Sequence, residues 1–175
     1  MRDKILKDWF RKGEMEKNKE NHFEAFIYLW ISWVIGCKIF VSLNIYRDTA
    51  QKNYTDRDDI IDWCKDNAAF VVDTINKNRN SLDYLGKRNG SKYGNPIIDA
   101  SPRLSSYFSL LKRYFNNEFQ YKNEKELAVH FAELLNKIRN NLFHGDKTYN
   151  EKADLELLNS VLPVLYEFAK KVSEK

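Results

Sequence analysis

An arginine and a histidine with four residues between them stand in the segment Arg139-Asn140-Asn141-Leu142-Phe143-His144. Arginine presents a planar fork of donors that matches phosphate oxygens, and histidine can exchange a proton with a hydroxyl or a leaving oxygen near neutral pH. Asn140 lies one helical turn before His144, close enough to orient the imidazole or a substrate. We therefore predict a site for phosphate chemistry with Arg139, Asn140 and His144 as its catalytic residues. The alternative at this point is that both charged residues are ordinary solvated side chains near a helix end.

An amphipathic helix is expected to carry these residues. Successive helical residues turn by about 100°, which places Arg139, Asn140 and His144 on the outward face. Gly145 stands at the expected helix C-cap, where the negative end of the helix dipole favours a protonated His144. The opposite face is an apolar stripe that should meet a core, and it consists of Leu127, Phe131, Leu134, Leu135, Ile138 and Leu142.

The outward face also carries Asn136 and Phe143. An aromatic side chain among outward polar residues is better explained by an interface than by solvent. We therefore expect a two-fold homodimer with Asn136 and Phe143 in its interface. Arg139 and His144 of both subunits would then share one cleft, in which the two histidines could act as base and acid.

Composition favours one folded domain over residues 1–175, because 43% of the residues are hydrophobic. The 29 Lys and Arg exceed the 25 Asp and Glu, and the resulting net charge of +4 is compatible with nucleic acid but too small to demonstrate it. Two cysteines, Cys37 and Cys64, lie in apolar surroundings, which indicates a reducing cytoplasm. The sequence has no zinc-site spacing, P-loop or Rossmann motif, so we expect no metal and no cofactor. It also has no signal-peptide pattern, so we do not expect secretion.

One apolar run, Ala25 to Leu43, is long enough to cross a bilayer. Lys38 lies inside it, and Trp30 and Trp33 stand well within it rather than at interfacial ends. The other expected helices have apolar stripes that need a central partner. We therefore interpret this run as a buried bundle helix and expect no membrane association.

The remaining pattern predicts an all-α fold. Gly and Pro residues interrupt the chain between residues 78 and 102, which makes this the longest expected loop. Lys87, Arg88 and Lys92 in the loop could bind single-stranded RNA, although a solvated connection is the favoured explanation. The other expected elements are a peripheral arm over residues 1–19, a long helix over 21–43, a helix that opens at Thr55 or Asp56 and continues to Ile75, a helix over 103–115, and a C-terminal stripe over 155–172 that Pro163 either kinks or divides.

The segment RNNLFHGDK resembles the signature of the HEPN domains, in which an Arg and a polar residue precede a His, and is most similar to the Apea-related variant. A second segment, FEAFIYLWISWVIGCKIF from Phe23 to Phe40, is similar to the aromatic helix near the start of these domains. The resemblance implies an all-α bundle of five to six helices over roughly residues 20–170 that dimerises through its signature helices. Arg139, Asn140 and His144 match the family's functional positions.

Many HEPN domains are metal-independent endoribonucleases that act as toxins or in phage defence, and others only bind RNA or nucleotides. The resemblance therefore implies an endoribonuclease regulated by an antitoxin or another protein, and the alternative is a non-catalytic module that binds RNA, a nucleotide or a protein partner. The sequence departs from the family at Trp33 and Val34, where relatives often carry an Asn. Asp146 stands where a modified tyrosine silences one toxin subgroup, so this chain does not match that subgroup.

Overall fold

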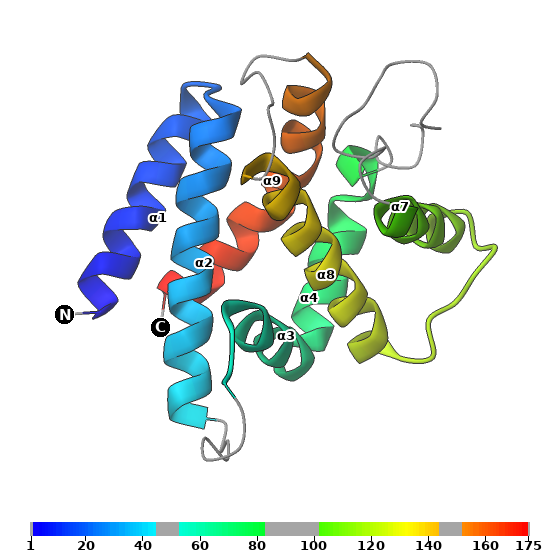
Figure 1. Cartoon of the computed structure of the whole chain (residues 1–175), viewed down its shortest axis with the longest axis horizontal. Helices are drawn as coiled ribbons and strands as arrows, with labels where there is room; N and C mark the ends of the chain where they lie inside the picture. Colours follow the sequence, from blue (N-terminus) through cyan, green and yellow to red (C-terminus); the bar gives the residue numbers. More distant parts are fainter. Residues whose placement is uncertain (1, 45–52, 83–101, 144–151, 175) are drawn as a thin grey trace.

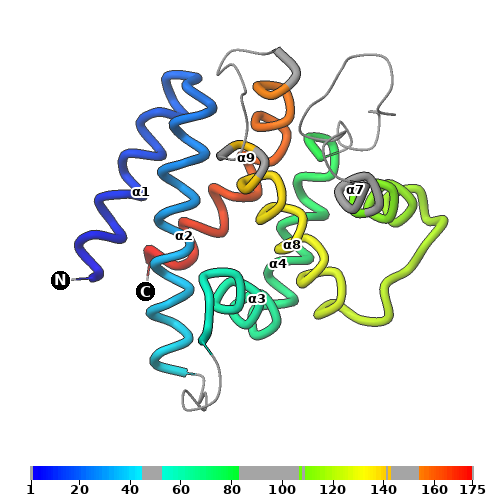
Figure 2. The backbone as a smooth tube through the Cα atoms, in the orientation of Figure 1, coloured from blue at the N-terminus to red at the C-terminus, as the bar shows by residue number. Residues whose placement is uncertain are grey.

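The computed structural model describes residues 2–44, 53–82, 102–143 and 152–174, and within these ranges the regular structure is entirely helical. This confirms the all-α class, but the described ranges hold seven long helices where five to six were expected. Figures 1 and 2 show α1 and α2 side by side, α9 behind the centre, and α8 crossing in front of α4. The main helices are α1 (Arg2–Asn18), α2 (His22–Asn44), α3 (Asp56–Asp66), α4 (Ala68–Lys77), α7 (Pro102–Phe115), α8 (Glu124–Phe143) and α9 (Lys152–Ser173).

The first helix, α1, lies at the edge of the fold beside α2 (Figure 1). Gly13 permits a close approach, since a Cβ there would lie 2.7 Å from the Leu29 side chain. The Ser32 hydroxyl donates to the Leu6 carbonyl at 3.2 Å, and the Tyr166 hydroxyl of α9 donates to Glu14 at 2.8 Å. The expected N-terminal arm is therefore a helix fastened to both α2 and α9.

The long helix α2 supplies much of the core. Ala25, Phe26, Leu29, Trp33 and Cys37 are all fully buried. Among the described helices, α2 is the one long and apolar enough to span a membrane by length and composition, yet half of its most apolar window is buried inside the fold. The burial supports the interpretation of α2 as a core helix.

Gly36 allows α2 and α9 to meet closely, because a Cβ at this position would lie 2.3 Å from the Cβ of Val172. We expect Gly36→Ala to lower the melting temperature. Overpacking costs roughly 1–3 kcal/mol, which here exceeds the gain in helix propensity of about 1 kcal/mol. The reason is that the Val172 side chain branches at its Cβ and cannot rotate away from the added methyl group. Gly13→Ala is the comparison, since a Cβ there would approach the Leu29 side chain to 2.7 Å rather than 2.3 Å and should cost less. Equal melting temperatures of the two variants, measured by circular dichroism, would contradict this packing argument.

The single helix expected from Asp56 to Ile75 is wrong, because the structure divides this stretch into α3 and α4 at Asn67. The start is as predicted: Thr55 caps α3 and forms a reciprocal capping box with Asp58. The break arises where the Asn67 side chain donates to the Trp63 carbonyl at 2.8 Å and the Asn67 backbone leaves helical geometry, with φ −111° and ψ 29°. An asparagine that bonds to nearby backbone groups competes with the helix in this way.

The expected loop over 78–102 also begins too early. Residues 79–82 are helical, the Leu82 amide donates to the Asn78 carbonyl at 3.1 Å, and the Leu82 side chain is fully buried. At the other end, α7 begins at Pro102 as the sequence predicts to within one residue. The buried Leu82 thus extends the helical stretch into the first residues of the predicted loop.

The last helix, α9, continues through Pro163. Figure 2 shows that it changes direction along its length, so the kinked form of the two alternatives is confirmed. Leu162 and Val164 on either side of the proline are buried at 2% and 0% exposure. Packing on both sides of the bend holds α9 as one element despite the hydrogen bond that proline cannot donate.

An aromatic cluster joins α2, α3 and α9 in the middle of the fold. The Trp33 ring lies 5.9 Å from that of Trp63 and 5.2 Å from that of Phe168, measured between centroids. Phe131 brings α8 to the same cluster, with its ring 6.3 Å from Phe168. The helix that carries the candidate site is therefore anchored directly to the centre of the core.

Candidate functional site

The helix α8 (Glu124–Phe143) positions the candidate site. Its apolar stripe is as the sequence predicts: Leu127 is 2% exposed, Phe131, Leu134, Leu135 and Ile138 are fully buried, and Leu142 packs against the core. The helix contacts α3, α4 and α7. It is thus held on more than one side, which restricts the orientation of the residues at its C-terminal end.

Arg139 and Asn140 lie together in the last turns of α8. The Nη1 of Arg139 donates to the Oδ1 of Asn140 at 2.9 Å, so two neighbouring residues form one polar unit. The bond turns the Asn140 oxygen toward the guanidinium and leaves the NH₂ of that amide directed elsewhere. A guanidinium and an amide NH₂ in one unit offer donors of the kind that phosphate oxygens accept.

The expectation that this face is simply solvated is only partly correct. Asn136, Arg139 and Asn140 are each half-buried, and no residue whose side chain the structure describes between Leu127 and Leu142 is fully exposed. The cause is that α8 has neighbours beyond its core stripe. Half-burial strengthens electrostatic interactions of Arg139, because screening by water is weaker there than at an open surface.

The other predicted site residues are placed less completely. Phe143 ends α8, and its side chain is not among those described. His144, the predicted acid and base, lies outside the described residues, as do Lys87, Arg88 and Lys92 of the expected RNA-binding loop. The structure therefore brings Arg139 and Asn140 together and places position 144 directly after the helix that carries them.

Comparison with known proteins finds no matching family model, no similar curated protein and no similar solved structure. The resemblance to HEPN domains therefore remains a hypothesis that depends on the residues of this chain. Within the described parts of the chain, no group of three or more His, Cys, Asp or Glu side chains is placed to hold a metal ion.

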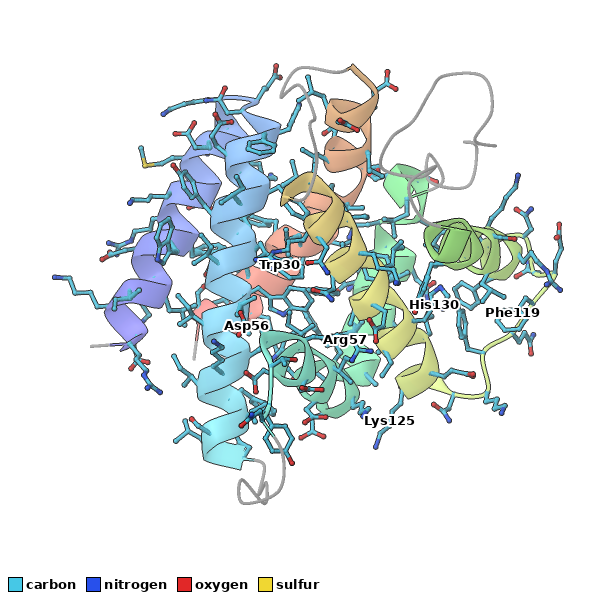
Figure 3. The ribbon with its side chains drawn as sticks, in the orientation of Figure 1. Trp30, Asp56, Arg57, Phe119, Lys125 and His130 are labelled. Carbon is cyan, nitrogen blue, oxygen red and sulfur yellow. The ribbon has the colours of Figure 1, made fainter. Side chains whose placement is uncertain are left out.

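An ion pair that the sequence did not reveal fastens α8 to α3. Arg57 donates to both carboxylate oxygens of Glu133: its Nε lies 3.0 Å from Oε2, and its Nη2 also bonds to Oε1. The Glu133 side chain is 12% exposed, and its hydrogen bonds raise the pKa of Arg57 above the ordinary value. Bidentate pairs of this kind constrain geometry as well as adding energy. Figure 3 shows Arg57 beneath α8, so the pair fixes the site helix over α3.

His130 is a second feature that sequence reasoning left without a role. Its Nε2 lies 3.1 Å from the Tyr107 carbonyl oxygen, and its ring lies between those of Tyr107 and Tyr121, at centroid distances of 4.7 and 5.3 Å. Figure 3 places it on the side of α8 toward α7. Burial lowers the pKa of His130, and the Tyr107 carbonyl, Glu126 and Glu133 offset part of that effect. These contacts indicate a structural histidine that is neutral when folded.

The lowered pKa of His130 has a consequence for stability. The unfolded chain binds a proton at this residue more readily than the folded chain, so stability should fall as the pH decreases through the ordinary histidine range toward pH 5. We expect the free energy of unfolding in urea to fall less between pH 7 and pH 5 for His130→Gln than for the wild type. The glutamine retains an N–H donor for the Tyr107 carbonyl. An identical pH dependence of the two proteins would show that His130 does not titrate differently on folding.

Proposed function

We propose that this protein is a metal-independent, cofactor-free endoribonuclease of the cytoplasm, with Arg139, Asn140 and His144 as its catalytic residues. The single observation that supports it best is the 2.9 Å bond between Arg139 and Asn140 at the end of α8, directly before position 144. Residues four apart share one face of a helix. His144 follows Asn140 by this spacing in the sequence.

The proposed reaction begins at a 2′-hydroxyl of RNA. His144 takes the proton from this hydroxyl, the 2′-oxygen forms a bond to the adjacent phosphorus, and the bond from phosphorus to the 5′-oxygen breaks. Arg139 stabilises the charge that develops on the phosphoryl oxygens, while Asn140 holds the phosphate or the imidazole. A second His144, or water, protonates the leaving 5′-oxygen. The products are a 2′,3′-cyclic phosphate and a 5′-hydroxyl, and DNA resists cleavage because it has no 2′-hydroxyl.

The second His144 in this scheme comes from another copy of the chain. We propose a two-fold homodimer in which Asn136 and Phe143 contact their counterparts, so that both catalytic sets share one cleft. The half-buried Asn136 lies one turn before Asn140 on α8, on the same face of the helix. The resemblance to HEPN domains extends the proposal to a toxin or phage-defence effector that a cognate antitoxin or regulatory protein controls.

The test uses end-labelled RNA in excess EDTA with the wild type and His144→Ala. We expect only the wild type to cleave, leaving cyclic phosphate ends. Cleavage that requires added Mg²⁺, or that survives in His144→Ala, would overturn the mechanism. Sedimentation of both proteins in parallel shows whether the variant has kept the fold and the oligomeric state of the wild type.

The second candidate is a non-catalytic module that binds RNA, a nucleotide or a protein partner through the same residues. The hydrogen bond from Arg139 to Asn140 supports this binding module as well. A guanidinium that is half-buried and held by its neighbour can bind a phosphate without taking part in a reaction. RNA binding by the folded protein without any cleavage would support this candidate over the enzyme.

A further inference from the structure

A hollow of about 330 Å³ opens at the opposite end of α8 from the candidate site. The end of α7, the segment over residues 116–123 and the first turn of α8 surround it. Its size lies at the lower end of the range for small-ligand sites. The side chains that matter for its chemistry are Tyr114, Asn117, Phe119, Gln120, Tyr121 and Glu124.

We propose that this hollow binds a nucleobase, stacked on one aromatic ring and read by amide side chains. The base belongs either to a single-stranded RNA or to a free nucleotide. Where RNA supplies it, the inference rests on the proposed function, because it adds a binding subsite to the same substrate. None of the residues involved belongs to the catalytic set.

The aromatic rings at the hollow pack edge to face on one another, and the Arg113 guanidinium lies 5.6 Å from the centroid of the Phe119 ring. The rings of Phe119 and Tyr121 lie 5.0 Å apart with their planes at 82°, and Tyr114 meets Tyr121 at 5.5 Å and 64°. Rings at right angles form a corner, so a base stacked on one ring presents its edge to the other. Phe119 is only half-buried, and Figure 3 shows it at the edge of the molecule beyond α7. Every base has a π-face, so stacking of this kind accepts all four.

The amide groups at the hollow are held by a defined turn. Asn117 has a left-handed backbone, with φ 58°. The amides of Asn117 and Glu118 donate to the carbonyls of Tyr114 and Arg113 at 3.1 and 2.8 Å, which forms a Schellman motif at the end of α7. Asn117 therefore extends from a fixed backbone, and the exposed Gln120 follows three residues later. Amide side chains carry donors and acceptors that can pair with the edge of a base.

Tyr121 belongs to the lining of the hollow and carries a buried polar atom. Its hydroxyl oxygen is buried and has no hydrogen-bond partner among the described residues. A buried hydroxyl without a partner is unfavourable, and polar atoms left in this state need an explanation. Because this oxygen has almost no accessible surface, a base in the hollow could bond to it only if the Tyr121 side chain turned toward the hollow.

The distribution of charge favours a neutral group inside the hollow. Glu124 is part of the lining, which disfavours a phosphate there. Lys112 and Arg113 are exposed in the last turn of α7, and Lys122 is exposed in the segment that follows. The arrangement suits a nucleotide whose base enters the hollow while its phosphate stays outside, near these cations.

The hollow and the catalytic residues can be filled together only by a strand. Leu127, which lines the hollow, precedes Arg139 by twelve residues on one helix, or about 18 Å along its axis at 1.5 Å per residue. A mononucleotide therefore fills one of the two places. An oligonucleotide of sufficient length fills both and should bind more tightly than a dinucleotide.

The test measures binding of AMP, of UMP and of a fluorescent twelve-nucleotide RNA with 2′-O-methyl groups, which block the proposed cleavage. We expect Phe119→Ala to weaken binding of the oligonucleotide roughly 5- to 150-fold, the range for loss of one stacked base. Phe119→Trp keeps a stacking face and should bind as the wild type. Gln120→Ala, an exposed position, and Asn117→Gly, which keeps the left-handed turn, should each weaken binding without affecting the fold.

The outcomes separate the two proposals. Oligonucleotide binding that depends on Phe119, without cleavage of ordinary RNA, supports the hollow and contradicts the nuclease. Cleavage that depends on His144, with oligonucleotide and mononucleotide binding unchanged in Phe119→Ala, Gln120→Ala and Asn117→Gly, overturns the hollow and leaves the nuclease intact. Binding of AMP or UMP that depends on Phe119, with the oligonucleotide unaffected, supports the hollow and identifies a free nucleotide as its ligand. Absence of binding of any probe to the folded wild type also overturns it.

Discussion

Replacing Arg139 by alanine is expected to slow RNA cleavage by roughly 10²- to 10³-fold, the loss that follows removal of one donor to a developing oxyanion. The reason is that Arg139 is half-buried and already oriented by its bond to Asn140, so little reorganisation accompanies the reaction. Single-turnover rates at saturating RNA measure this effect. The rate constant at saturation should fall, since the interaction strengthens in the transition state rather than in the bound substrate.

Two further variants make this result specific. Arg139→Lys keeps a positive charge and most of the aliphatic stem but loses the planar fork, so it should recover only part of the rate. Lys125→Ala removes an exposed cation from the first turn of the same helix and should cleave as the wild type. If Arg139→Ala is folded and cleaves at the wild-type rate, Arg139 is not catalytic. If Lys125→Ala loses as much activity, the effect is one of overall charge.

Local patterns in the sequence account for most of the elements found. The stripe from Leu127 to Leu142 predicts α8 because burial of a helix face depends on residues three and four apart, which the sequence lists directly. Thr55 predicts the start of α3 for the same reason, since its capping partner Asp58 is three residues away. Both inferences require contacts within one or two turns only.

Errors arose where a local hydrogen bond or a distant contact decided the outcome. The apolar stripe continues across Asn67, so periodicity gives no sign that its side chain ends α3. Leu82 is buried by contacts from elsewhere in the fold, which extends the helical stretch into the predicted loop. A pattern of hydrophobic residues reports which face is apolar, but it does not report where a side chain bonds to its own backbone.

At the candidate site, too, local features could be predicted from the sequence and tertiary contacts could not. The neighbouring pair of Arg139 and Asn140 follows from spacing, whereas their half-burial does not, because a helical wheel shows no neighbours beyond the apolar face. Arg57 and Glu133 are 76 residues apart, and no feature of the sequence pairs them. The tertiary contacts of α8 are what convert a recognisable segment into a fixed arrangement.

Replacing Trp33 by alanine is expected to destabilise the protein by about 3–5 kcal/mol, the usual cost of a large aromatic-to-alanine cavity. Trp33 is fully buried and its ring lies within 6 Å of those of Trp30, Trp63 and Phe168, with centroid distances of 5.4, 5.9 and 5.2 Å. Such a loss is a large fraction of the 5–15 kcal/mol of a typical domain, according to the general range. Urea denaturation of the purified variant measures it.

The nature of the replacement should matter more than its size alone. The Trp33 indole nitrogen is buried and has no hydrogen-bond partner among the described residues. Phenylalanine removes this unfavourable N–H and keeps an aromatic ring, so Trp33→Phe should cost much less than Trp33→Ala. Asparagine would instead place an amide among aromatic rings. Burying an amide without partners costs roughly 1–3 kcal/mol beyond the cavity itself. Trp33→Asn should therefore be the least stable of the three variants. If Trp33→Asn is instead as stable as Trp33→Phe, position 33 is open to water or to a polar partner. The order of stability Phe, Ala, Asn would instead show that the apolar surroundings of position 33 exclude a polar side chain.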